Sequence, residues 1–204
     1  MQLTIYIFLT LSISLAKGQT ILSQKFYEDG TLKAEGIEGE LGKEGSWKFY
    51  YPDGSTNSIE EYRHDMLHGK VEYYDFGGAL IGEENWQRNL LQDSAYYYYS
   101  NGSIEKKGVY KNGLYEGKWQ FFYKDGQLKR LGSYQQGLPD GDWIFYHENG
   151  ELWQIGSFMG GKESGEWKFY TPKGKLEYTG QFENGERVGN WYRYTARGKK
   201  KKMK

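Results

Sequence analysis

The sequence predicts an all-β chain of tandem hairpins that together form one long, twisted antiparallel sheet. Three observations support this fold class: turn glycines that return every 24 residues, a composition rich in aromatic residues and Gly, and a scarcity of Ala. Aromatic residues make up 18% of the 204 residues and Gly occurs 29 times, whereas a long helix needs Ala, Leu, Glu and Lys with Gly kept out. The mean hydropathy of −0.87 is low, but disordered chains lack aromatic residues. We therefore expect a folded chain with a core made of rings.

The first 18 residues are predicted to be a signal peptide that lies outside the fold. Leu3 to Ala16 form an apolar run that is too short for the ~20 residues of a membrane-spanning helix. Ala16 and Gly18 stand at −3 and −1 of a cleavage site before Gln19, which is the small-residue pattern of signal peptides. The alternative is a buried first strand. A signal peptide indicates an exported protein, either periplasmic, on the outer surface or secreted.

Residues 19–198 form an array of 24-residue units, and we count positions in each unit from the glycine of its turn. These turn glycines are Gly30, Gly54, Gly78, Gly102, Gly126, Gly150, Gly174 and Gly198. Every unit has an aromatic residue at −4, and most have Gly at −9 and +6, Trp at −7, Phe or Tyr at −5 and a ring at +8. In the units between residues 60 and 95, Glu60 and Glu84 replace the Gly at +6, and Val71 and Ala95 replace the Trp. We expect these units to be looser or specialised.

Two segments show the unit most clearly. Gly108-Val-Tyr-Lys-Asn-Gly113 is followed by Gly117-Lys-Trp119, and Gly180-Gln-Phe-Glu-Asn-Gly185 is followed by Gly189-Asn-Trp191. This repeat resembles the MORN family, and more closely its bacterial variant, the YwqK-type antitoxin repeat. The resemblance implies a ladder of β-hairpins and a toxin-neutralising or partner-binding role. An exported antidote needs a target outside the cytoplasm.

The spacing predicts which side chains share a face of the sheet. A two-residue turn at positions −1 and 0 pairs −3 with +2, −5 with +4, −7 with +6 and −9 with +8. Because side chains alternate along a strand, the Trp at −7, the ring at −5, Leu at +2 and the ring at +8 share one face. The Trp covers the bare Gly at +6, and the ring at −4 points to the opposite, polar face. About seven hairpins are expected, with a two-layer sandwich as the alternative, and a single sheet with an exposed apolar face favours a homodimer or a bound partner.

The rings at position −4 are the predicted partner-binding residues. They are Tyr50, Tyr74, Tyr98, Phe122, Tyr146 and Tyr170. A row of rings in polar surroundings suits a protein interface, an extended peptide or stacking on sugars. We therefore predict an exported, non-enzymatic scaffold that binds a protein partner in a neutralising or assembly role. A cell-wall or glycan-binding module is the alternative function, and rings that only pack on one another are the alternative interpretation of this row.

Other features argue against catalysis and nucleic-acid binding. The chain has no Cys, which excludes disulfides and thiolate chemistry. His64 and His68 fall in a turn between hairpins and His147 in a packed strand, so we expect no metal, cofactor or catalytic site. Residues 20–196 carry 20 basic and 27 acidic residues, and an acidic body argues against nucleic acid as a partner. Residues 199–204 are predicted to be a basic, disordered tail, the one part suited to an anionic membrane.

Overall fold

A computed structural model describes residues 20–195 and 197–203, so the predicted signal peptide lies outside the described residues. Its regular structure consists of seventeen strands. The strands are β1 Ile21–Phe26, β2 Leu32–Gly39, β3 Gly42–Tyr50, β4 Thr56–Arg63, β5 Met66–Tyr74, β6 Leu80–Gln87, β7 Leu90–Leu91, β8 Asp93–Tyr98, β9 Ile104–Lys111, β10 Leu114–Phe122, β11 Leu128–Gln135, β12 Leu138–Tyr146, β13 Leu152–Met159, β14 Lys162–Tyr170, β15 Leu176–Glu183, β16 Glu186–Tyr194 and β17 Lys200–Lys202. None of the described residues forms a helix with the length and apolar character needed to cross a bilayer.

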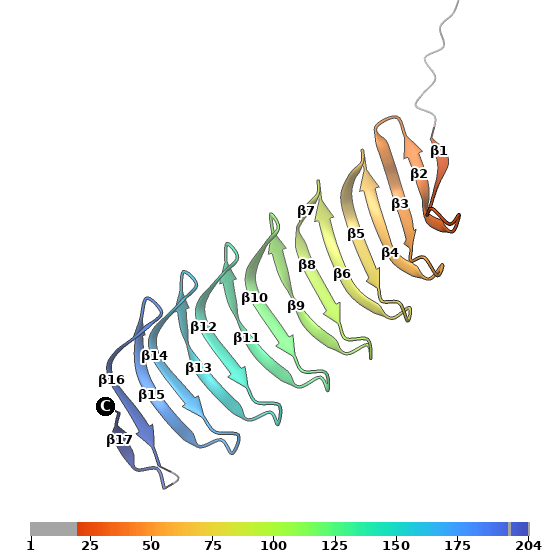
Figure 1. The fold of residues 1–204 in the computed structure, drawn as a ribbon. Helices are drawn as coiled ribbons and strands as arrows, with labels where there is room; N and C mark the ends of the chain where they lie inside the picture. The colour runs from red at the N-terminus through yellow and green to blue at the C-terminus, as the bar shows by residue number, and fades with distance from the viewer. Residues whose placement is uncertain (1–19, 196, 204) are drawn as a thin grey trace, which may run out of the picture.

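The strands form one antiparallel sheet in which each strand except β7 pairs with the next long strand along the chain. The short strand β7 pairs with one end of β6, and β8 pairs with the rest of β6. Figure 1 shows the hairpins side by side as a long twisted strip, with bent strands and turns along both edges. The predicted fold class is confirmed. The described chain contains eight glycine-turn hairpins rather than about seven.

The eighth hairpin corrects the prediction of a disordered tail at 199–204. Lys200–Lys202 forms β17, which pairs with β16, and the amide of Met203 donates to the carbonyl of Trp191 at 2.8 Å. The turn at Gly198 closes as the other glycine turns do, because its amide donates to the carbonyl of Thr195 at 2.7 Å. The regular 24-residue period therefore extends into a segment whose composition alone suggested disorder.

The glycine turns are three-residue loops, which corrects the predicted two-residue turn. At the second turn, the amide of Gly54 donates to the carbonyl of Tyr51 at 2.9 Å, and the amide of Tyr51 donates to the carbonyl of Ser55 at 2.8 Å. Gly54 has a φ of +86°, the left-handed conformation that completes such a loop. The longer loop pairs −4 with +2, as in Tyr50 with Thr56. The other three predicted pairings, beginning with −5 and +4, are present.

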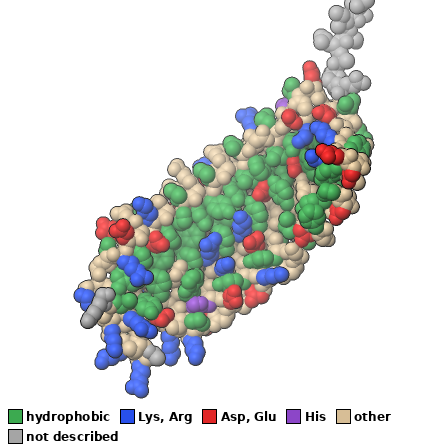
Figure 2. Space-filling view, in the orientation of Figure 1, with side chains coloured by type: hydrophobic (Ala, Val, Ile, Leu, Met, Phe, Trp, Pro, Cys, Tyr) green, Lys and Arg blue, Asp and Glu red, His purple; other side chains and the backbone are tan. Residues whose placement is uncertain are grey.

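One face of the sheet, which we call the ring face, carries positions −7, −5, +4, +6 and +8. The Trp residues at −7 are large, buried side chains of this face: Trp47, Trp119, Trp143, Trp167 and Trp191. They pack against the rings at −5 and +8, as Trp143 does against Phe145 and Phe158 with centroids 5.7 Å apart in both pairs. Figure 2 shows a band of apolar side chains along the strip, with charged side chains set among them. From Tyr110 to Trp191, the core of this single sheet is therefore an unbroken row of contacting rings.

Each Trp lies on the glycine of the preceding unit. The predicted pairing of −7 with +6 in one hairpin occurs, as in Trp143 with Gly156. However, the ring of Trp143 leans the other way and covers Gly132, where an added Cβ would overlap the indole. The Trp143 Nε1–H donates to the carbonyl of Ser133 at 3.1 Å. The pairing of β11 with β12 is irregular between Leu131 and Ser133. The Trp143 indole therefore satisfies the Ser133 carbonyl, which the irregular pairing leaves available.

The units that depart from the repeat obey the same contact rule. Glu60 at +6 is followed by Val71 at −7, and Glu84 is followed by Ala95, so a large side chain at +6 always meets a small one at −7. Val71 and Ala95 are completely buried. The Glu84 side chain is buried and accepts hydrogen bonds from the Tyr97 hydroxyl and the Trp86 indole. These units are specialised, with a carboxylate at +6 and a small side chain at −7 in place of the Gly and Trp pair; Glu84 is buried and Glu60 is half-buried.

Candidate partner-binding surface

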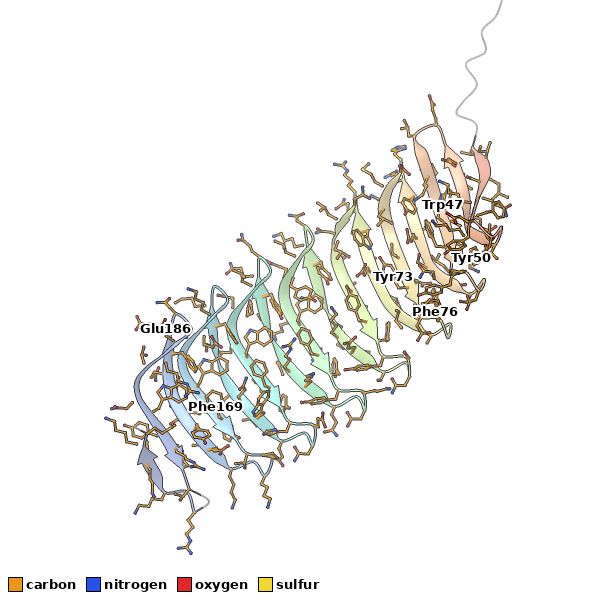
Figure 3. All side chains as sticks on the ribbon, viewed as in Figure 1. Trp47, Tyr50, Tyr73, Phe76, Phe169 and Glu186 are labelled. Carbon is orange, nitrogen blue, oxygen red and sulfur yellow. The ribbon has the colours of Figure 1, made fainter. Side chains whose placement is uncertain are left out.

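The six predicted partner-binding rings lie in equivalent places at the ends of strands. Tyr50, Tyr74, Tyr98, Phe122, Tyr146 and Tyr170 are the last residues of β3, β5, β8, β10, β12 and β14. All six are half-buried, and we call this set the tyrosine column. Figure 3 shows Tyr50 at the edge formed by the glycine turns, whereas Trp47 lies farther along the strand. The loop geometry explains this placement, because each ring residue is the last one paired before its turn.

The backbone of the column is held by the ring at −3 of the preceding unit. The hydroxyl of Tyr51 donates to the carbonyl of Tyr74 at 2.9 Å, and that of Tyr99 donates to the carbonyl of Phe122 at 2.9 Å. Tyr27 and Tyr123 make the same contact one unit on. These bonds connect successive hairpins beyond the ladder itself. They hold the backbone of the column at Tyr50, Tyr74, Phe122 and Tyr146, whereas Asp75 takes the −3 position that precedes Tyr98.

His147 occupies the same −3 position and makes the equivalent side-chain contact to the backbone of the next unit. Its Nε2 lies 2.9 Å from the carbonyl of Tyr170. This corrects the expectation of a packed strand residue, because β12 ends at Tyr146 and His147 begins the turn. A carbonyl accepts only from a protonated nitrogen, so this contact requires the tautomer with the proton on Nε2.

The polar face around the column agrees with the predicted alternation of side chains. The Tyr50 hydroxyl donates to Glu35 Oε1 at 2.6 Å, and the Lys48 Nζ lies 5.0 Å from the centre of the Tyr50 ring. Farther along, the Lys107 Nζ lies 5.8 Å from the centre of the Phe122 ring. The rings of these units therefore contact charged side chains of their own face. The aromatic pairs of the described chain instead join residues of the ring face and of the turns.

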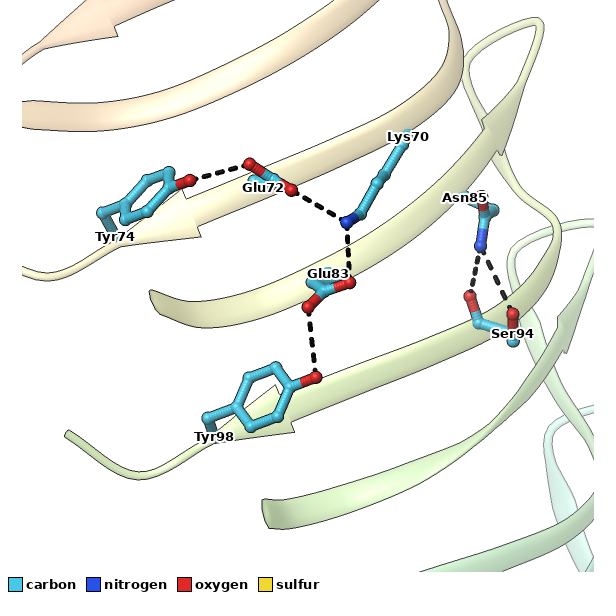
Figure 4. Close-up of polar contacts among 7 residues, drawn as sticks. All are labelled: Lys70, Glu72, Tyr74, Glu83, Asn85, Ser94 and Tyr98. Atoms are coloured by element: carbon cyan, nitrogen blue, oxygen red, sulfur yellow. Dashed lines mark hydrogen bonds and ion pairs between the residues drawn. The ribbon is translucent and has the colours of Figure 1, made fainter. Parts of the chain in front are cut away.

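A five-residue network joins two neighbouring members of the column (Figure 4). The Lys70 Nζ lies 2.8 Å from Glu72 Oε1 and 2.8 Å from Glu83 Oε2. The Tyr74 hydroxyl donates to Glu72 at 2.7 Å, and the Tyr98 hydroxyl donates to Glu83 at 3.1 Å. One lysine thereby positions two carboxylates, and each carboxylate orients one tyrosine. The two hydroxyls are held in place before any partner arrives.

Hydrogen bonding and burial keep these hydroxyls protonated. Burial, together with the hydrogen bond to Glu35, raises the pKa of Tyr50 to about 12. The hydrogen bond to Glu72, followed by burial, raises the pKa of Tyr74 to about 12. The pKa of Glu72 is lowered, first by its bond to Lys70 and then by its bond to Tyr74. At neutral pH the column therefore offers tyrosine rings next to ionised carboxylates.

The repeat analysis found the column but missed Lys70, Glu72 and Glu83. A signal was present, because these residues stand at −8, −6 and +5, which share the face of position −4. Their mutual contact depends on which side chains of the paired strands β5 and β6 are long enough to meet. Mapping charge onto each face would have identified the group.

The expectation of no His-based metal site concerns His64 and His68, which line one surface pocket together with Arg63 and Arg88. His64 lies in a turn, where its Nδ1 is 2.7 Å from Glu44 Oε1, whereas His68 belongs to β5 rather than to the turn. Within residues 20–195 and 197–203, no three His, Asp or Glu side chains are grouped in a way that could hold a metal ion.

Among solved structures, the chain is similar to parts of much larger proteins. It matches a GtfA/B complex bound to UDP and GlcNAc with 16% identity over 57% of this chain and 23% of that one, at a TM-score of 0.25. It matches a TcdB2-TccC3-Cdc42 complex with 13% identity over 85% of this chain and 12% of that one, at a TM-score of 0.23. A Photorhabdus luminescens Tc holotoxin pore matches with 15% identity over 89% and 12%, at a TM-score of 0.24. The chain spans less than a quarter of each of these proteins, and similarity at this level says nothing about its function.

The family comparison gives a definite result. No curated protein matches the sequence. The family model described as a MORN repeat variant matches five segments: residues 43–64, 94–112, 115–136, 139–159 and 163–184. Together they cover just over half of the chain, and each includes strands whose side chains form the ring face. The chain belongs to the MORN repeat variant family.

Proposed function

We propose that this chain is an exported, non-enzymatic scaffold that binds a protein partner through the tyrosine column. The observation that carries the proposal is the network in which Lys70 holds Glu72 and Glu83, and these in turn orient Tyr74 and Tyr98. Fixed tyrosines lose little conformational freedom on binding, and tyrosine combines apolar area with a hydroxyl. Such residues are enriched among those that dominate interface energies.

A neutralising or assembly role suits a rigid repeat array with a long surface. Solenoid-like arrays present extended surfaces along which a partner contacts several units at once. Export is proposed from the apolar run at Leu3 to Ala16. An exported neutralising protein would act on a target outside the cytoplasm. The acidic balance of residues 20–196 favours a protein over a nucleic acid.

Capture from native envelope extract tests the proposal. The full chain with a C-terminal tag is compared with Tyr98→Ala, and retained protein and glycan are both identified by mass spectrometry. Phe76→Ala is the matched control, because Phe76 is an exposed ring outside the column, stacked on Tyr51. We expect one stoichiometric protein that is lost with Tyr98→Ala and kept with Phe76→Ala, while circular dichroism shows both variants folded.

Two results would contradict the proposal. Equal capture by Tyr98→Ala and by the unaltered chain would make the column structural. Retention of wall polysaccharide without a protein would favour the alternative function, in which the same rings stack on sugars.

A further inference from the structure

A second row of side chains crosses the sheet on the ring face, away from the tyrosine column. Position −5 of each unit pairs with position +4 on both neighbouring strands, so these positions form one line across the ladder. From β1 to β16 the line is Lys25, Ala34, Phe49, Ser58, Tyr73, Gly82, Tyr97, Lys106, Phe121, Arg130, Phe145, Gln154, Phe169, Tyr178 and Arg193. Rings alternate with +4 residues, which are small in the first units and long and polar from Lys106 onward.

Two cations lie on rings at the middle of this line. The Lys106 Nζ is 4.1 Å from the centre of the Tyr97 ring and 2.9 Å from the Tyr115 hydroxyl. The Arg130 guanidinium carbon is 4.1 Å from the centre of the Phe121 ring. Phe121 pairs with Lys106 on one side and with Arg130 on the other. Each cation therefore lies on the ring of the strand before its own: Lys106 on Tyr97 of β8 and Arg130 on Phe121 of β10, two strands apart.

Neither cation is neutralised within the chain. Among the described residues, the ion pairs involve neither Lys106 nor Arg130. The Arg130 Nε is buried and has no hydrogen-bond partner in the described chain. Partly desolvated cations without a counter-ion favour an anionic ligand, because a carboxylate there gains a charge-assisted hydrogen bond. The scarcity of such cations and the acidic body argue for isolated carboxylates rather than a polyanion.

The backbone spacing of Lys106 and Arg130 matches the repeat of one form of ligand. Strands in a sheet lie about 4.8 Å apart, so Lys106 and Arg130, two strands apart, are separated by about 9.6 Å at the backbone. A polyproline II helix has three residues per turn and rises 3.1 Å per residue, so its residues i and i+3 lie on one side about 9.3 Å apart. Proline-rich helices dock on aromatic grooves. The line continues to a hollow of about 410 Å³ lined by Phe169 and Tyr178.

We propose that the ring-face line is a second binding surface, and that it takes a proline-rich acidic peptide segment in the polyproline II conformation. Glutamates at i and i+3 contact Lys106 and Arg130, and the prolines between and beyond them pack on the half-buried rings of Tyr97 and Phe145. Because three residues of a polyproline II helix span about the distance of two strand spacings, the peptide lies across the strands, along the length of the sheet. This surface differs from the tyrosine column in face, charge and ligand.

Fluorescence anisotropy with defined peptides tests the proposal on the full chain. The probe is fluorescein-labelled Pro-Pro-Glu-Pro-Pro-Glu-Pro-Pro, and its matched control is Pro-Pro-Pro-Glu-Glu-Pro-Pro-Pro, with the same composition and charge. We expect the first peptide to bind at least tenfold more tightly than the second, with affinity that falls as salt rises. Equal affinity, or no binding of the first peptide at millimolar concentration, would overturn the proposal.

Paired variants locate the surface. Lys106→Gln with Arg130→Gln is expected to weaken binding of the first peptide at least tenfold. Lys107→Gln with Lys129→Gln removes the same charge from neighbouring residues that contact the rings of Phe122 and Tyr123 instead, and binding should change less than twofold. Equal loss in both pairs would mean nonspecific charge attraction and would refute the assignment. The two-peptide comparison remains decisive even if a variant folds poorly.

Discussion

Replacing Gly132 with Ala tests the contact between units that governs the ring face. A Cβ added at Gly132 would lie 2.6 Å from Cγ of Trp143 and closer still to Cδ2 and Cε2. The indole is 2% exposed and is held by its bond to the Ser133 carbonyl, so it has no free space into which it can move. The methyl group must displace the ring, the backbone or both.

The expected cost follows from these contacts. Inserting a methyl group into a packed core costs about 1–3 kcal/mol. Displacing the indole also loses its hydrogen bond, worth about 1 kcal/mol, while the lower entropy of the unfolded Ala chain returns about 0.4–1 kcal/mol. We expect Gly132→Ala to lower the free energy of unfolding by about 2–3 kcal/mol.

Urea denaturation followed by tryptophan fluorescence measures this change. Gly39→Ala is the matched control, because its nearest neighbour is the flexible Glu44 side chain, 3.2 Å away. In a Trp143→Ala background the second substitution at Gly132 should cost almost nothing, since the indole that the methyl group would overlap is then absent. A Gly132→Ala variant as stable as Gly39→Ala, or equally destabilised with and without the Trp143 ring, would refute the reasoning.

Three further predictions concern polar contacts. Tyr99→Phe removes the hydroxyl that donates to the Phe122 carbonyl and should lower the free energy of unfolding by about 1 kcal/mol, measured by urea denaturation; no change would mean that water replaces the bond at no cost. Glu84→Ala leaves the half-buried Tyr97 hydroxyl without its carboxylate acceptor and should cost about 1–3 kcal/mol, seen as a lower Tm in calorimetry; an unchanged Tm would contradict it. The pKa of Tyr50 is raised from 10 to about 12 in the folded chain. The protonated Tyr50 hydroxyl therefore contributes to the free energy of unfolding in full below pH 10, and this contribution is lost as pH rises toward 12. Unfolding measured across that window should show a decline that is smaller in Tyr50→Phe, and identical profiles would rule out this cause.

Most of the fold follows from the sequence because the repeat fixes both the turns and the alternation of faces. Its turn type does not, because Asp-Gly and Asn-Gly suit two-residue and three-residue loops alike. Only the backbone bonds, such as Tyr51 to Ser55, distinguish them. The direction in which each Trp leans was predicted wrongly: −7 pairs with a +6 residue on either side, and the predicted contact was with the glycine of the same hairpin instead of that of the preceding unit. The sequence contained the evidence for the direction, because Glu60 at +6 is followed by the small Val71 at −7, and Glu84 at +6 is followed by the small Ala95 at −7.

The surface was less predictable than the fold. Alternation alone places Tyr74 and Tyr98 on the polar face, as the structure has them. Their connection depends on the reach of the Lys70 side chain to Glu72 and Glu83 within one hairpin and on the bond from Glu83 to Tyr98 of the next hairpin, which no local pattern encodes. The tail shows the opposite case, because the lysines of β17 look disordered by composition but complete a hairpin that the period requires.

The lean of each Trp onto the glycine of the preceding unit has a consequence for how such an array grows. When a gene for tandem repeats gains or loses units by recombination, a breakpoint between Gly132 and Trp143 would separate two residues that must match. A breakpoint within a glycine turn, such as that of Gly126 or Gly150, keeps each +6 residue with the −7 residue it meets. The heritable module is therefore the pair of strands across the turn between hairpins, and the hairpin itself straddles two modules.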